Sequence, residues 1–178
     1  MQHPEALSRQ IVKIKNIELI NFSVLFVALA VALPLVAHQF HLAGPTFLPM
    51  HLFVFVAALL LGWRAGLIVG VLTPLVSFAV SGMPLPSVLP QIIVELATYG
   101  LVTGFCREKL GLNLWLSLII AMIFGRLSLG LAVWILGTNP AGPINQIFSV
   151  VKLGWIGILT QLALVPLIVI LLKRYWEK

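Results

Sequence analysis

Six long apolar runs divide this chain, and charged side chains are almost absent from them. Charged residues make up 9% of the sequence, whereas a soluble domain carries roughly 25%. So few charges cannot cover a fold in which 61% of the residues are hydrophobic, so the lipid bilayer must be the solvent. A chain in lipid must satisfy its backbone hydrogen bonds internally, which predicts helices for the runs 19–37, 47–61, 67–80, 88–105, 114–136 and 144–172.

The basic residues are distributed in a way that orients these helices. Lys and Arg occur before the first run, after the second, after the fourth and after the last, whereas the other three connectors hold none. Because cytoplasmic loops are enriched in Lys and Arg, this asymmetry predicts an all-α membrane protein with six transmembrane helices and both termini cytoplasmic. We expect one membrane domain over 1–178, in which 1–18 is a cytoplasmic or interfacial segment. The run 47–61 is short for a full crossing.

The residues that the sequence lacks argue against several chemistries. There is no Asp, no phosphate-binding loop of the Walker type and no nucleophile motif of a membrane hydrolase. We therefore expect neither an enzyme nor an ATPase, and no cofactor. His38, His41 and His51 lie near one connector, but they form no helical pair and have no carboxylate nearby. They are better interpreted as polar interface residues than as metal ligands, so no metal is expected.

Three ionisable residues interrupt the later runs: Glu95, Arg126 and Lys152. A charge in mid-bilayer costs roughly 2.5–3.5 kcal/mol on insertion scales, so such residues usually pair or face a wet cavity. In the predicted topology all three lie in the outer half of three consecutive helices, which predicts one polar pocket open to the exterior. The second cation leaves a spare positive charge that a substrate carboxylate could balance. Two alternatives stay open: Glu95 pairs with Arg126 or Lys152 only to lock helices together, or Lys152 reaches to the outer headgroups.

Other polar and aromatic groups lie at the same depth. Gln91 and Tyr99 flank Glu95 at one helical turn on either side, so the three share a face. Trp155 follows Lys152 by three residues. We add Asn145, at the outer end of the last run, and His51 to this candidate substrate site. Trp134 is better interpreted as part of an interfacial aromatic belt.

Small residues at spacings of four mark flat helix faces. Ala28 and Ala32 form such a pair in the first run, and Gly62, Gly66 and Gly70 follow the same spacing around the third. Such faces let two helices approach closely. They serve either internal packing or the docking of a separate membrane subunit.

Several short segments, in this order, resemble a known family. They are Ala28-x-x-x-Ala32, Gly44-Pro-Thr-Phe-Leu-Pro-Met-His51, Leu61-Gly-Trp-Arg-Ala-Gly66, Ser81-Gly-Met-Pro84 and Glu95-Leu-Ala-Thr-Tyr-Gly100. With the six-run plan, they make nearly the whole chain similar to the substrate-binding S component of an energy-coupling factor (ECF) vitamin transporter.

The resemblance implies a function and partners. An S component in the plasma membrane of a prokaryote captures a small vitamin or vitamin precursor at the outer face and carries no ATPase. It docks on a membrane coupling subunit that holds two cytoplasmic ATPases, and the docking face corresponds here to Ala28 and Ala32. The resemblance also implies that the segment 41–50 is a lid and that the whole component topples to release its substrate inward. The alternative is a structural or assembly subunit without a ligand.

Overall fold

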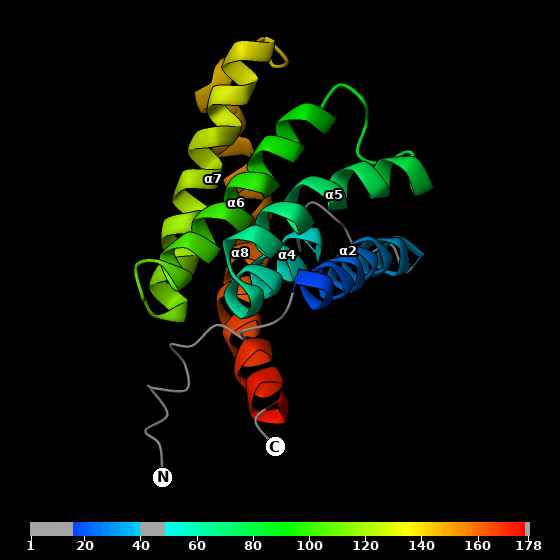
Figure 1. Ribbon diagram of the computed structural model, residues 1–178. Coiled ribbons are helices and arrows are strands. Elements are labelled where there is room, and N and C mark those ends of the chain that lie inside the picture. The colour runs from blue at the N-terminus through cyan, green and yellow to red at the C-terminus, as the bar shows by residue number, and fades with distance from the viewer. Residues whose placement is uncertain (1–15, 40–48, 177–178) are drawn as a thin grey trace.

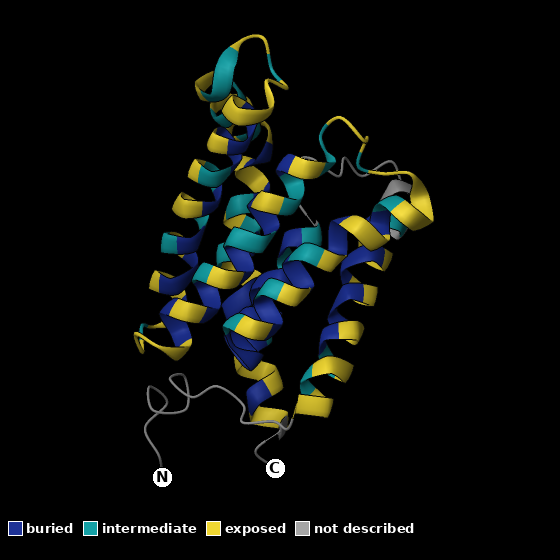
Figure 2. Cartoon of the chain, turned by 45° about the horizontal axis from the view of Figure 1, so that its top comes forward, coloured by how far each residue is buried: buried dark blue, intermediate teal, exposed yellow. Residues whose placement is uncertain are grey.

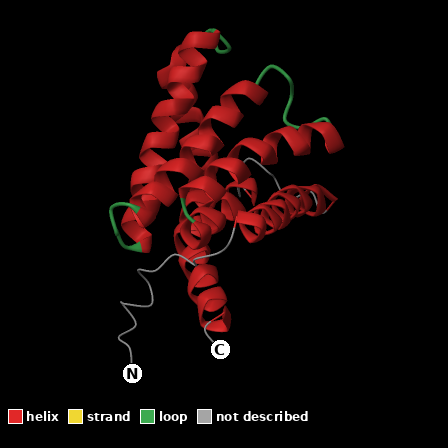
Figure 3. Ribbon diagram, viewed as in Figure 1, coloured by secondary structure: helices red, strands yellow, loops and turns green. Residues whose placement is uncertain are grey.

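The computed structural model describes residues 16–39 and 49–176, and every regular element in these residues is a helix (Figures 1 and 3). The helices are α2 (Asn16–Gln39), α4 (Pro49–Leu61), α5 (Trp63–Ser81), α6 (Leu89–Glu108), α7 (Leu114–Leu136) and α8 (Gly142–Trp176). The six predicted apolar runs are thus six helices, and the all-α prediction is confirmed. Helix α6 lies between α5 and α7 and makes its most extensive contacts with these two.

Five of these helices, all but α4, are long and apolar enough to cross a membrane. Helix α4 has 13 residues, which corresponds to about 20 Å at the rise of an α-helix, against a hydrocarbon core of roughly 30 Å. Its residues 54–61 are all buried and it packs against α2, α5, α6 and α8, so α4 is a core helix (buried residues are dark blue in Figure 2). The shortness noted in the sequence therefore reflects a helix enclosed by protein. The sidedness of the termini stays a prediction.

A single residue, Gly62, separates α4 from α5. Its φ of 90° lies in the region that only glycine adopts without strain, so the chain can change direction there in one step. The carboxylate of Glu108, at the end of α6, accepts a hydrogen bond from the Trp63 amide at 3.2 Å. This contact supplies the side-chain acceptor that Gly62 cannot offer to the first turn of α5.

Helices α5 and α6 approach each other through glycine. A Cβ added at Gly100 would overlap the Gly66 carbonyl, and one added at Gly70 would overlap the Leu96 carbonyl. Only glycine allows this backbone-to-backbone contact, so Gly66 and Gly70 serve internal packing rather than a separate subunit. The contact fixes how α6 is rotated about its axis, and therefore which of its side chains face the interior.

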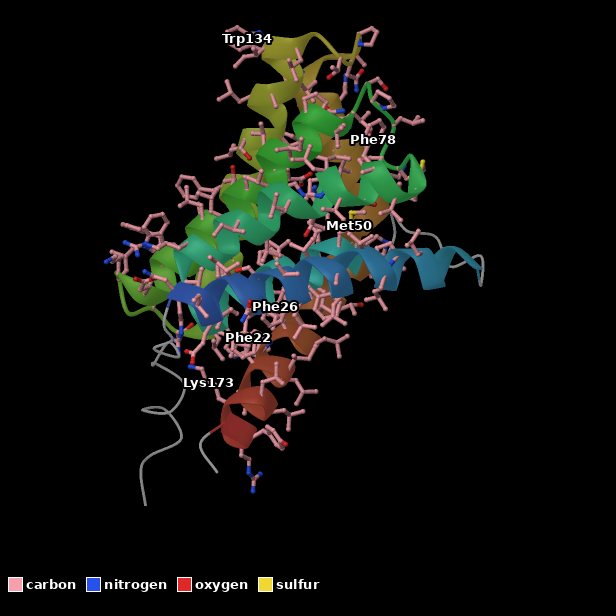
Figure 4. The ribbon with its side chains drawn as sticks, turned by 45° about the vertical axis from the view of Figure 1, so that its right-hand side comes forward. Phe22, Phe26, Met50, Phe78, Trp134 and Lys173 are labelled. Atoms are coloured by element: carbon pink, nitrogen blue, oxygen red, sulfur yellow. The ribbon has the colours of Figure 1, made fainter. Side chains whose placement is uncertain are left out.

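Two exposed tryptophans mark the ends of α7. Trp115 is 51% exposed and Trp134 is 70% exposed; at the helical rise their separation along the axis is roughly 28 Å, close to the thickness of the hydrocarbon core. Figure 4 shows Trp134 at one end of the molecule and Lys173 towards the other. The rings of Trp115 and Trp134 are therefore spaced as expected for the aromatic belts at the two membrane interfaces. Arg126 then lies about 12 Å below the Trp134 end.

Candidate solute-binding site

A polar stripe runs along the buried face of α6. Gln91, Glu95 and Tyr99 are spaced one helical turn apart, and they are 3%, 4% and 2% exposed. Side chains at this spacing share one face, and the α5–α6 contact turns that face inward. The expectation that these three residues share a face is confirmed.

Glu95 is the centre of the stripe. Its Oε1 accepts a hydrogen bond from the Tyr99 hydroxyl at 2.9 Å and forms an ion pair with Nη1 of Arg126 on α7. The Arg126 guanidinium also lies 5.9 Å from the centre of the Tyr99 ring, within reach of a cation–π interaction. Of the ion pairs considered from the sequence, the structure contains the one between Glu95 and Arg126. We refer to Glu95, Tyr99 and Arg126 with His51 as the polar cluster.

Aromatic rings from α4 complete the surroundings of Tyr99. The His51 ring meets it edge to face at a centroid distance of 5.3 Å, and the Phe55 ring lies at 5.1 Å. His51 is 8% exposed, so it belongs to the cluster rather than to a surface connector. Three helices, α4, α6 and α7, thus supply the site.

Two contributors to the site were missed in the sequence. Phe55 sits in an unbroken apolar run, which carries no signal for a particular residue. Gly125 leaves the space for the Tyr99 ring, because a Cβ there would overlap the ring atoms. A glycine inside a long apolar helix, directly before the charged Arg126, was the available signal for a close approach.

The connector between α7 and α8 lies beside the start of α6. The Thr138 hydroxyl donates to the side-chain carbonyl of Gln91 at 3.3 Å. Two hydrogen bonds join this connector to the start of α8: Asn139 Nδ2 donates to Gln146 Oε1 at 2.6 Å, and Asn145 Nδ2 donates to the Ala141 carbonyl at 2.6 Å. Gln91 therefore links the polar stripe to this connector, whereas Asn145 binds the connector residue Ala141, directly before its own helix.

Helix α8 does not bring its predicted residues into the polar cluster. Lys152, Trp155 and Asn145 are all exposed. Within the described residues Lys152 forms no ion pair, and Glu95 pairs with Arg126 alone. Three charged residues were expected to share one pocket. The structure brings together Glu95 and Arg126 but not Lys152. An exposed Lys152 fits the alternative in which its chain extends to the headgroups.

Other expectations fall outside the described part of the chain. These are the interfacial segment before residue 16, His41, and the lid over 41–50 apart from its last two residues. Among the described residues, no group of three or more His, Cys, Asp or Glu side chains could hold a metal ion.

The small-residue pair of α2 faces outward. Ala28 and Ala32 are exposed, whereas Ala30 and Val31 are 0% and 6% exposed on the face that packs against the bundle. The flat alanine face is thus not used for packing within the described chain, which leaves it available to lipid or to another membrane protein.

Five apolar helices of spanning length around a buried polar cluster define a multi-pass membrane protein with a polar site inside its helix bundle. A model of the family described as ECF transporter, substrate-specific component matches residues 19–176. The chain therefore belongs to this family and is the substrate-binding subunit of an ECF transporter, as the resemblance implied. Comparisons with curated proteins and with solved structures gave no match.

Proposed function

We propose that this subunit captures a small vitamin or vitamin precursor at the outer face of a prokaryotic plasma membrane for ATP-driven import. The polar cluster of α4, α6 and α7 is the proposed binding site. The observation that supports it is the ion pair between buried Glu95 and partly buried Arg126, which lies about 9 Å along α6 from the helix start and about 12 Å along α7 from Trp134. Charged groups inside a membrane domain are costly and mark substrate pathways in transporters.

The proposal also covers the partners. Energy comes from a module made of a membrane coupling subunit and two cytoplasmic ATPases, since this chain contains no Walker loop. The exposed Ala28 and Ala32 face of α2 is the proposed contact with the coupling subunit. A flat surface of small side chains lets a second helix approach closely within lipid, where dispersion contacts drive association.

The binding role is tested on the purified chain alone. We expect native mass spectrometry to detect a retained small molecule in the detergent-solubilised protein, without ATP or any partner subunit. To cover a solute that is lost during purification, the emptied protein is also titrated with a panel of vitamins and their precursors. A protein that neither retains nor binds any solute would contradict the proposal.

Enlarging the alanine face of α2 separates docking from binding. With Ala28→Leu and Ala32→Leu together, we expect uptake in cells to fall at least about 10-fold, because a bulky ridge keeps the partner helix at a distance. Solute binding to the purified variant should equal that of the wild type. Ala163→Leu, on an exposed part of α8, is the matched control and should leave uptake unchanged. Full uptake by the double variant would place the docking contact elsewhere.

A further inference from the structure

The polar cluster uses only part of its hydrogen-bonding capacity. Both the Tyr99 hydroxyl and Arg126 Nη1 bind the same oxygen of Glu95, Oε1. Among the described residues, Glu95 Oε2 accepts no hydrogen bond, and Nε and Nη2 of Arg126 donate none. The two side chains keep 5% and 11% of their surface exposed, so the pair is not completely enclosed. The cluster therefore holds an unused acceptor beside unused donors.

The charges of the Glu95–Arg126 pair cancel. Glu95 contributes one negative charge and Arg126 one positive charge. The second cation predicted for the site, Lys152, lies exposed on α8. An anionic ligand at Arg126 would lie next to the Glu95 carboxylate, where the low dielectric makes repulsion between like charges strong. The spare positive charge that favoured an anionic substrate in the sequence is absent from the cluster.

From this geometry we propose that the site takes a solute without net charge. Its polar edge presents a hydrogen-bond donor to Glu95 Oε2 beside an acceptor for Arg126. A carboxamide, a lactam or a ring nitrogen with an amino group on the next carbon has such an edge, since each carries a donor and an acceptor bonded to the same carbon. This inference rests on the proposed function, because it assigns the substrate class of that same site.

The first test determines the substrate class by identifying the solute that co-purifies with the protein. Small molecules extracted from the purified wild-type protein are identified by mass spectrometry, and their net charge at pH 7 follows from their structure. A recovered solute without net charge that bears adjacent donor and acceptor groups is the expected result. An anionic solute overturns this inference and leaves the binding function intact. The absence of any retained or bindable solute overturns the proposed function, and this inference with it.

The second test asks whether one substitution weakens or strengthens solute binding. Glu95→Gln removes the carboxylate and leaves the Arg126 charge uncompensated. We expect the recovered solute, returned to the emptied variant, to bind about 10- to 100-fold more weakly, the usual effect of losing a hydrogen bond to a charged group. An anionic solute would instead bind as tightly or more tightly, because the repelling charge has gone.

Glu108→Gln is the matched control for this change. It makes the same substitution on the same helix, roughly 20 Å from Glu95 along its axis. We expect wild-type affinity in that variant. Unchanged or tighter binding by Glu95→Gln overturns the inference. If Glu95→Gln does not fold, the net charge of the recovered solute still decides whether the site takes an uncharged solute. That measurement needs only the wild-type protein.

Discussion

Arg126→Met is expected to abolish solute binding and to destabilise the protein by about 3–5 kcal/mol, the usual effect of breaking a buried ion pair on one side. The substitution keeps a long apolar side chain of similar reach but leaves the Glu95 carboxylate, paired only with Arg126 among the described residues, without its cation. We expect affinity for the recovered solute to fall at least about 100-fold, because the guanidinium supplies several donors in a fixed geometry. Titration calorimetry and the free energy of unfolding in detergent measure the two effects.

A double variant separates the two roles of the pair. Adding Glu95→Gln to Arg126→Met removes the uncompensated charge, so most of the lost stability should return. Binding should stay absent, because both groups that face the solute have been changed. If the double variant binds as the wild type does, the pair serves only to hold α6 and α7 together. Arg174→Met, at the exposed end of α8, is the control for loss of a cation and should change neither property.

Gly100→Leu is expected to prevent folding or to lower the free energy of unfolding by more than about 4 kcal/mol, beyond the usual range for overpacking. An added Cβ would overlap backbone atoms of Gly66, which cannot move aside as a flexible side chain could. Helices α5 and α6 would have to separate, and the polar stripe of α6 would turn with them. Thermal unfolding monitored by circular dichroism in detergent measures the loss.

Smaller changes at the same contact give a graded test. Gly100→Ala should destabilise less than Gly100→Leu and should reduce solute binding, because Glu95 and Tyr99 lie on the helix that is displaced. Ala79→Leu enlarges an exposed position of α5 and should leave stability within about 0.5 kcal/mol of the wild type. Wild-type stability of Gly100→Leu would show that the two helices do not approach as closely as described.

Much of the architecture followed from local sequence. The predicted runs 114–136 and 67–80 correspond to α7 (Leu114–Leu136) and α5 (Trp63–Ser81). Hydrophobic length and the Gly- and Pro-rich breaks report the position of a helix along the chain, because each depends only on neighbouring residues. The same local information placed Gln91, Glu95 and Tyr99 on one face, since the helical repeat fixes their relative directions.

The sequence left open which charged side chains pair across helices. Glu95, Arg126 and Lys152 were assigned similar depths, yet Glu95 pairs with Arg126 while Lys152 is exposed. Depth follows from counting residues at a fixed rise per residue. The direction of a side chain depends on the rotation of the whole helix about its axis, and that rotation is set by packing.

The sequence by itself therefore determined that this chain lies in a membrane as six apolar helices, roughly where each lies along the chain, and which residues carry charge inside them. The tertiary structure decided that α4 is enclosed by its neighbours and that Ala28 and Ala32 face outward, although the spacing alone also allowed internal packing. It also decided that Glu95 pairs with Arg126 and that Lys152 lies exposed. The physical reason is that contacts such as that of Gly66 with Gly100 rotate each helix, and only the assembled bundle contains those contacts.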